Sequence, residues 1–303
     1  MTEKPGIICV GAMLWDVIGH SPVRLKPGED VAGLIHQRPG GVALNVAVAL
    51  ARHGLAPAIL SAVARDGPGE GLITETHRLG VATDWLWRDG PKPTDLYMAI
   101  ETPDGLFAAI ADAHGLEAAG TAILSPLENG TLGSSVVPWE GTLVVDGNLT
   151  QDTLAIMAEA PFLSRAFLRI VPASPDKAER LVPLLNHPNA IFHINLAEAE
   201  ALAGRPLDGA IEAAEAIAAL GAARVLVTDG PRSAAEAARG LPTIIQTPPC
   251  VEARHVTGAG DAFLATHLAA ELAGASREQA LDQAIQAATK HITAHPVTRK
   301  DIA

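Results

Sequence analysis

The chain has 303 residues, 48% of them hydrophobic, and a formal net charge of −12 at pH 7. This much apolar sequence can bury a large core, so we expect a folded protein and no extended disorder. The acidic residues are spread along the chain, and the lysines and arginines form no cluster, which predicts no nucleic-acid partner. A nucleotide ligand is not excluded, because phosphates are bound locally by backbone N–H groups and helix N-termini.

The cysteines indicate a reducing environment. Only two occur, Cys9 in an apolar run and Cys250 after two prolines, and neither has the spacing of a metal or redox site. We therefore predict a cytoplasmic location. The charged first residues precede no secretory apolar stretch, and no run is long enough to span a bilayer, so we expect no membrane partner.

Short apolar runs alternate with helical patterns along the chain. This alternation predicts an α/β fold with a mostly parallel central sheet flanked by helices. The predicted strands are 7–10, 58–62, 143–146, 167–171, 191–194 and 224–228. The predicted helices are 45–53, 69–79, 151–160, 177–185, 209–220, 260–273 and 276–294.

Two segments, 17–38 and 94–114, interrupt this alternation. In the second one, residues 103–105 read Pro-Asp-Gly between two apolar stretches, which is a strong hairpin signal. We therefore predict a small β-lid that projects from the sheet. Nothing repeats at a solenoid period and no Pro/Ser-rich linker divides the chain, so residues 1–303 are predicted to form one domain with this lid.

The segment 255–263 is a turn of small residues that leads directly into a helical pattern. Gly258, Ala259 and Gly260 allow successive backbone N–H groups to point at one place, which makes the turn a candidate anion hole. Asp261, at the start of the helix, could then accept the proton of an attacking hydroxyl during phosphoryl transfer. A glycine turn with an aspartate helix cap is the competing interpretation.

Other nucleotide and hydrolase motifs do not fit this sequence. Gly258 and Gly260 begin like a dinucleotide fingerprint, but Phe263 occupies the position of the third glycine. The chain contains no Walker-type glycine loop, no zinc-protease motif and no nucleophile elbow. The candidate anion hole therefore belongs to a different class of site.

Residues 40–45 read Gly-Gly-Val-Ala-Leu-Asn and lead into an alanine-rich helix. Together with the segment 255–263 they resemble the two signatures of the ribokinase-like (PfkB) carbohydrate kinase family, with the family's spacing and over essentially the whole chain. The resemblance implies a Rossmann-like three-layer fold and an ATP-dependent phosphotransferase with an alcohol group as acceptor. It also implies that Gly40, Gly41 and Asn45 contact the substrate.

The resemblance assigns a further substrate residue, Asp16, which follows the first strand and matches the family's aspartate for sugar hydroxyls. A carboxylate accepts two hydroxyl groups well. The competing interpretations are a solvated loop carboxylate for Asp16 and a helix N-cap for Asn45.

The residues predicted to bind the nucleotide also follow from the resemblance. Asn195 and Glu198 match the family's N-x-x-E motif, which organises Mg²⁺ and phosphate through waters, so we predict no direct metal ligand. A capping box is the competing interpretation of this pair. Thr228 and Gly230 match the T-x-G-x-x-G nucleotide loop and are predicted to contact the ATP phosphates, although Ser233 replaces the last glycine.

Several positions depart from the family pattern. Ala64 replaces the glycine that ends the first signature. His255 stands where relatives with a monovalent-cation site have an acidic residue, which argues against potassium activation. Lys177 lies where related kinases often place a basic residue near phosphate or substrate, and a solvated lysine at a helix start is the alternative.

Within the family, the segments 59–63, 93–113, 144–148 and 256–261 most resemble pseudouridine kinases. The resemblance implies phosphorylation of pseudouridine to pseudouridine 5′-phosphate, with Asp261 taking the 5′-hydroxyl proton. The alternatives are a kinase for ribose or another sugar, an ADP-dependent or sugar-phosphate kinase, and a sugar- or nucleoside-binding regulatory protein without turnover. The free edges of the lid strands also predict a homodimer.

Overall fold

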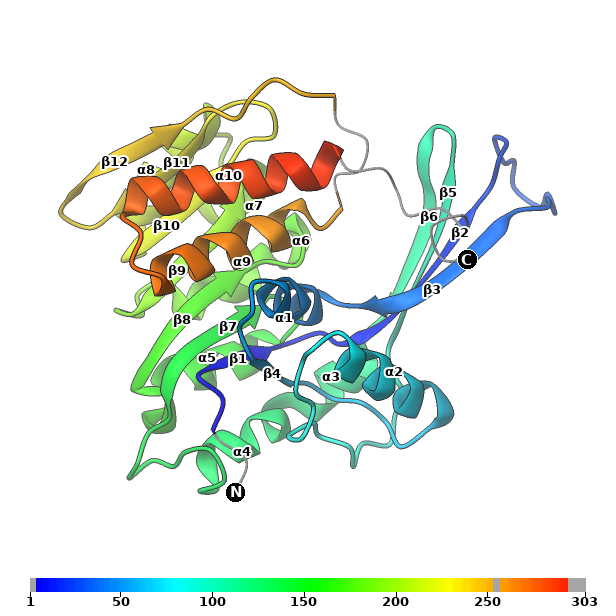
Figure 1. Ribbon diagram of the computed structural model, residues 1–303, viewed down its shortest axis with the longest axis horizontal. Coiled ribbons are helices and arrows are strands. Elements are labelled where there is room, and N and C mark those ends of the chain that lie inside the picture. Colours follow the sequence, from blue (N-terminus) through cyan, green and yellow to red (C-terminus); the bar gives the residue numbers. More distant parts are fainter. Residues whose placement is uncertain (1–3, 253–256, 294–303) are drawn as a thin grey trace.

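The protein is described by a computed structural model that covers residues 4–252 and 257–293. An eight-stranded sheet with the order β12-β11-β10-β9-β8-β7-β1-β4 forms its centre (Figure 1). The strands are β1 (Ile7–Val10), β4 (Pro57–Leu60), β7 (Glu140–Asp146), β8 (Arg165–Val171), β9 (Ala190–Asn195), β10 (Arg224–Thr228), β11 (Ala234–Ala238) and β12 (Leu241–Gln246). All neighbours from β10 to β4 pair in parallel, which confirms the predicted α/β fold.

Helices cover both faces of this sheet. They are α1 (Val42–Arg52), α2 (Gly67–Arg78), α3 (His114–Ala119), α4 (Ser125–Glu128), α5 (Gln151–Glu159), α6 (Pro175–Ala178), α7 (Leu196–Ala203), α8 (Gly209–Ala219), α9 (Ala259–Leu272) and α10 (Arg277–Thr293). Alternate strand residues face opposite cores: Leu143 and Val145 of β7 pack in a core with α5, α7 and α8, whereas Val144 packs with α1 and α9. Two apolar layers therefore enclose the sheet, as a three-layer fold requires.

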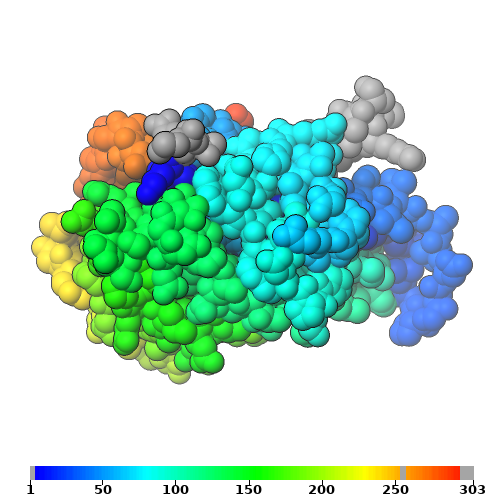
Figure 2. Space-filling model, turned by 90° about the horizontal axis from the view of Figure 1, so that it is seen from below, coloured from blue at the N-terminus to red at the C-terminus, as the bar shows by residue number. Residues whose placement is uncertain are grey.

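A second, four-stranded sheet, here called the lid, has the order β3-β2-β5-β6, and its strands lie largely in the two segments for which we predict a β-lid. Its strands are β2 (Leu14–His20), β3 (Leu34–Gly40), β5 (Leu96–Thr102) and β6 (Gly105–Asp112). The lid projects from one end of the molecule, where the N-terminal strands are drawn in blue (Figure 1 and Figure 2). The hairpin between β5 and β6 turns at Pro103 and Asp104, where the sequence predicts it.

Two aspartates fix the base of the lid to the body. Asp95, the residue before β5, is buried and accepts hydrogen bonds from the backbone N–H groups of Gly115 (2.7 Å) and Leu116 (3.0 Å), which follow β6. Asp66 accepts a bond from the Thr94 backbone N–H (3.0 Å) and also caps helix α2. Both ends of the β5–β6 hairpin are therefore anchored.

Some elements differ from the sequence prediction. The helix expected over 177–185 is divided into the short α6 and a 3₁₀ helix at Glu179–Leu184, which contains Pro183 and so lacks one backbone donor. The strands β11 and β12 were not predicted, because the alanine-rich sequence of β11 carries little strand propensity. Of the predicted helix 276–294, residue 294 lies outside the described residues. Within the described ranges, no helix has the length and apolarity to cross a bilayer.

Candidate active site

The predicted site residues gather at one edge of the central sheet. Thr228 ends β10 and Asn195 ends β9, and the two residues are direct partners in the parallel register. Helices α1 and α9 pack against each other in the same apolar core, and their first turns carry the two glycine segments. In open α/β sheets, ligands bind outside the carboxyl ends of the strands, which is where these residues lie.

Asp261 is the third residue of helix α9 and is half-buried. The N-cap is Gly258, whose φ of 86° lies in the left-handed region that favours glycine, so the interpretation of Asp261 as the helix cap is wrong. The N–H groups of Ala259, Gly260 and Asp261 stand in the first helical turn, where backbone donors have no intrahelical acceptor. A helix start of this kind can bind a phosphoryl group beside the carboxylate.

The surroundings of Asp261 suit a proton acceptor. Burial raises the pKa of the Asp261 carboxyl to about 7, a hydrogen bond from the Asn45 side chain lowers it, and the charges of Asp146 and Asp16 raise it. The structure thus brings together side chains from α1, α9, β2 and β7. A general base with a pKa near 7 can take up a proton close to neutral pH.

Asp146 joins the turn after β1 and the start of α1 to the sheet, a role that the sequence analysis does not predict. Its fully buried carboxylate accepts hydrogen bonds of 2.9 Å from the backbone N–H groups of Ala12, Ala43 and Asn148. These bonds fix the turn after β1 and the start of α1. The only signal in the sequence is an apolar strand that ends in Asp-Gly-Asn at residues 146–148.

Asp16 lies on strand β2 with only 14% of its side chain exposed, so the interpretation as a solvated loop carboxylate is wrong. Burial raises its pKa, and Arg38 lowers it. A Cβ atom at Gly40 would overlap the Asp16 carboxyl group. Gly41 is the N-cap of α1 with a φ of 97°, so Asn45 is a residue of the first helical turns and not the cap.

Replacing Gly40 with alanine is expected to lower kcat/KM for the acceptor by up to about 10²-fold, because the methyl group displaces the Asp16 carboxylate. Steady-state kinetics with the acceptor varied measure this effect. Gly67→Ala is the matched control, since a Cβ at Gly67 meets no atom within 4 Å and its φ is not positive. Equal kinetics for the two variants would contradict the placement of Asp16.

Asn195 and Glu198, which are predicted to organise Mg²⁺ and phosphate, form the capping box of helix α7. The Asn195 side chain accepts a bond from the Glu198 N–H (3.0 Å), and the Asn195 N–H donates to Glu198 Oε2 (2.8 Å). Burial raises the pKa of Glu198 to about 7, the two Asn195 bonds lower it, and the charge of Asp261 raises it. The box is therefore present, and its carboxylate interacts electrostatically with Asp261.

Three other predicted positions are also placed. Gly230 adopts the left-handed conformation (φ 54°) in the turn after Thr228. Lys177 is not a free surface lysine, because its Nζ donates a 2.7 Å bond to the side chain of Asn148, next to Asp146. His255, on which the potassium prediction depends, lies outside the described residues.

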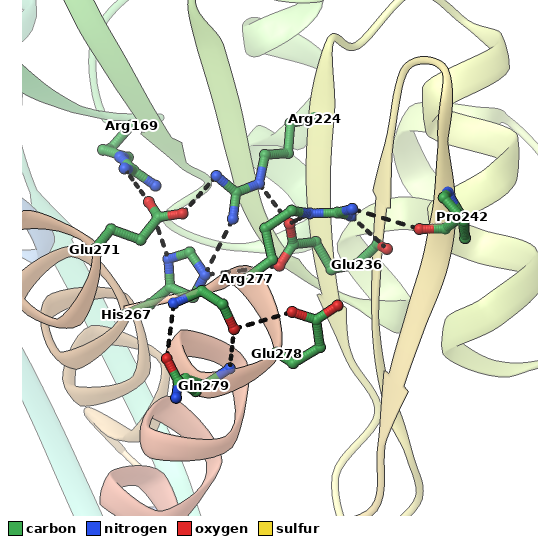
Figure 3. Close-up of polar contacts among 10 residues, drawn as sticks. Arg169, Arg224, Glu236, Pro242, His267, Glu271, Arg277, Glu278 and Gln279 are labelled. Atoms are coloured by element: carbon green, nitrogen blue, oxygen red, sulfur yellow. Dashed lines mark hydrogen bonds and ion pairs between the residues drawn. The ribbon is translucent and has the colours of Figure 1, made fainter. Parts of the chain in front are cut away.

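The far end of helix α9 is held by a buried group of charged residues, here called the ionic network (Figure 3). Glu271 of α9 pairs with Arg169 of β8 (2.5 Å) and with Arg224 of β10 (2.6 Å). Glu236 of β11, which is fully buried, pairs with Arg224 (2.5 Å) and with Arg277 of α10 (2.7 Å). The network thus connects the helix that carries Asp261 to three strands and to α10.

A three-layer α/β fold with a lid, and a half-buried carboxylate beside a glycine-rich helix start, are the features that the two signature segments predict for a small-molecule kinase. The family model for pfkB family carbohydrate kinases matches residues 4–301. The chain therefore belongs to the pfkB family of carbohydrate kinases and is a phosphotransferase, as its two signature segments indicate.

The comparisons also identify individual relatives. The chain is 33% identical to an uncharacterised sugar kinase, YeiI, of Escherichia coli over 156 residues, which span 51% of this chain and 41% of that protein. It is 28% identical to a pseudouridine kinase of the same species over 271 residues, which span 88% of this chain and 83% of that protein. The structure of Arabidopsis thaliana ribokinase complexed with ribose and ATP matches with a TM-score of 0.75 at 20% identity, covering 99% of this chain and 98% of that one. The first two relatives are named as a sugar kinase and a pseudouridine kinase, and the third shows that the chain shares the fold of a ribokinase.

Proposed function

We propose that this protein transfers the γ-phosphoryl group of ATP to the 5′-hydroxyl of pseudouridine. The observation that carries the phosphoryl transfer is the Asp261 carboxylate, with its pKa raised to about 7, in the first turn of a helix whose N-cap is a left-handed glycine. The choice of acceptor is supported by the similarity to a pseudouridine kinase over 88% of this chain. The same geometry would serve other hydroxymethyl acceptors.

In the proposed reaction, Asp16, Gly40 and Gly41 hold the sugar hydroxyls. Asn45, through its hydrogen bond to Asp261, orients the carboxylate that accepts the 5′-hydroxyl proton. The 5′-oxygen then forms a bond to the γ-phosphorus, the bond between that phosphorus and the β–γ bridging oxygen breaks, and ADP leaves. Backbone N–H groups at 258–260 stabilise the negative charge of the transferring group.

The nucleotide would lie along the ends of β9 and β10, with Thr228 and Gly230 at its phosphates. Asn195 and Glu198 would hold Mg²⁺ through water, and the ion would neutralise phosphate charge when bound. The fit is supported by the buried carboxyl group of Glu198. Burial raises the pKa of this group, and a nearby cation would stabilise its ionised form. The ribokinase with the same fold was solved with ATP, which supports ATP as the donor. We expect no potassium requirement.

A second candidate acceptor is ribose or another free sugar. It is favoured by the 33% identity to the sugar kinase YeiI, although that match spans only about half of this chain. The substrate-side residues Asp16, Gly40 and Asn45 would serve a free sugar in the same way. The acceptor therefore has to be decided by turnover.

The test is a coupled ADP-release assay with Mg-ATP and a panel of pseudouridine, uridine, ribose and other sugars. We expect selective turnover of pseudouridine. Turnover of a different acceptor would support the kinase assignment and show that pseudouridine is not the substrate. Binding of an acceptor without turnover would favour a regulatory protein, and faster turnover with ADP as the donor would indicate an ADP-dependent kinase.

We also propose a homodimer formed through the lid. Ile35, Met98, Ile100 and Ile110 lie on the lid face opposite to Asp16 and are exposed, with 76% of Ile35 and 70% of Ile110 accessible. An apolar patch of this kind marks an interaction surface, and a second copy of the lid is the partner we propose. The location proposed for the protein is the cytoplasm, because both of its cysteines are free thiols.

Replacing Ile110 with glutamate is expected to convert the dimer to a monomer of 31.3 kDa, because a charge is placed in the apolar patch. Light scattering coupled to size-exclusion chromatography measures the mass. Val136→Glu is the control, since Val136 is also exposed but belongs to a loop outside the lid. A monomeric wild-type protein would rule out the lid dimer.

A further inference from the structure

The lid carries a row of three polar side chains beside the proposed sugar site. Asp16 of β2 lies directly opposite Arg38 of β3 on one side and opposite Tyr97 of β5 on the other. Side chains at opposed positions of neighbouring strands point to the same face of a sheet. This face is the one that meets the body, because the charge of Asp16 acts on Asp261 of helix α9 and only 14% of the Asp16 side chain is exposed.

The two outer members of the row are hydrogen-bond donors. The Arg38 Nε lies 3.6 Å from Asp16 Oδ2, while 49% of the Arg38 side chain remains exposed and can contact a ligand. Burial, followed by the charges of Asp16 and Glu101, raises the pKa of Tyr97, so its hydroxyl stays protonated. Arginine has no acceptor atom, and a protonated tyrosine hydroxyl beside a carboxylate is a donor.

The neighbouring row toward the tip of the lid is mostly apolar. It contains His36, Ile18, Ala99 and Ala109, which are aligned in the registers of β3, β2, β5 and β6. Ala109 is exposed and Ile18 is partly exposed, whereas Ala99 is buried, so Ala109 and Ile18 provide the apolar surface on which the face of a heterocycle can pack. Adjacent strands are about 4.8 Å apart, so the row from Arg38 to Tyr97 spans about 10 Å, more than a furanose ring needs.

We propose that Arg38 and Tyr97 are specificity-determining residues that donate hydrogen bonds to carbonyl oxygens of the acceptor's base. The site would then select nucleosides with a dicarbonyl pyrimidine over free sugars and over bases that present an amino group. An amino group would face these donors and leave them unpaired, which is the strongest means of rejecting a close analogue. This inference rests on the proposed function and specifies the part of the acceptor that the sugar-binding residues do not contact.

The test compares the wild-type enzyme with Arg38→Met and Tyr97→Phe, using pseudouridine and cytidine as acceptors. For Arg38→Met we expect the KM for pseudouridine to rise about tenfold while kcat stays within about twofold, because the lost contact contributes to binding and not to chemistry. The preference for pseudouridine over cytidine should fall by a similar factor. Tyr97→Phe should show the same pattern with a smaller change.

Arg24→Met is the matched control, because Arg24 is another lid arginine whose partner is Asp104 at the hairpin tip (2.7 Å). It should leave both constants unchanged. The proposed role of Arg38 is contradicted if Arg38→Met lowers kcat/KM equally for pseudouridine and cytidine, because Arg38 would then act only through the Asp16 carboxylate. It is also contradicted if the variant changes kcat/KM for neither acceptor.

Calorimetric binding of pseudouridine in the absence of nucleotide separates this inference from the proposed function. Binding of pseudouridine that depends on Arg38, without turnover, would support base recognition by Arg38 and contradict the kinase reaction. Turnover of pseudouridine by Arg38→Met with the KM of the wild-type enzyme would support the kinase reaction and contradict the proposed role of Arg38. A wild-type protein that binds no pseudouridine would overturn the inference as well.

Discussion

Asp261→Asn is expected to lower kcat by about 10²- to 10⁴-fold, which is the range of a lost general base. Asparagine has nearly the same shape as aspartate, so the start of α9 and the bond from Asn45 can persist while the proton acceptor is lost. The KM values for ATP and acceptor should change only slightly. Asp152→Asn in the first turn of α5 is the matched control, because this exposed aspartate lies outside the site. Equal rates for both variants would show that Asp261 is not the base.

The same carboxylate predicts the pH dependence of the enzyme. Because the pKa of Asp261 is raised to about 7, it is protonated below that pH and cannot accept the hydroxyl proton. We therefore expect kcat/KM for the acceptor to rise with pH through a limb centred near 7. Asn45→Ala removes a bond that lowers this pKa, so its limb should move to higher pH. A limb that stays in place would mean that another group is being titrated.

Much of the site could be predicted because its chemistry is local in the sequence. The turn at 258–261 needs glycine for its left-handed N-cap, and the residues that follow it form a helix, so motif and conformation coincide. The same holds for Gly40 and Gly41, which stand in close contact with the Asp16 carboxyl and with the Ala12 carbonyl. Backbone geometry explains why glycine is needed at both places, whereas the functional roles predicted for these residues depend on the resemblance to the kinase family.

The residues that sequence reasoning missed are connected through contacts between distant segments. Asp146 bonds Ala12 across 134 positions and Ala43 across 103, so no local pattern reveals its role. Arg38 and Tyr97 are members of the site only because β2 lies between β3 and β5 in the lid, a register that strand alternation does not determine. The sequence predicted the lid, and the structure was needed to show which face of it meets the body.

The ionic network predicts a large loss of stability on a change that preserves shape. Glu271→Gln removes the charge that Arg169 and Arg224 share, and leaves two guanidinium groups under-compensated in a buried setting. Removing one partner of a buried ion pair costs about 3–5 kcal/mol, so we expect a clear fall in Tm and in the free energy of unfolding. Glu212→Gln at the exposed pair with Arg205 is the control and should have little effect.

The network also predicts how stability depends on pH. Burial opposes ionisation of Glu236, but His267 at 3.7 Å and the ion pairs with Arg224 and Arg277 lower its pKa to about 2. A carboxylate with a lowered pKa stabilises the fold above its unfolded pKa, and this contribution is lost as the pH falls from about 4.5 toward about 2. Thermal unfolding measured across this range should show this loss of stability. The loss should be smaller in Glu271→Gln, because the pKa of Glu271 is also lowered in the folded protein and the variant removes this carboxyl group.

A double variant distinguishes stability from positioning. Arg169→Met with Glu271→Leu removes a buried pair together and leaves Arg224 with Glu236, so much of the stability lost in Glu271→Gln should return. Glu271 lies ten residues after Asp261 on the same helix, which corresponds to about 15 Å. If the network only stabilises the fold, the double variant should also recover kcat. If it sets the position of α9 relative to the sheet, Tm should recover while kcat stays low, because a small displacement of Asp261 is enough to impair the transfer.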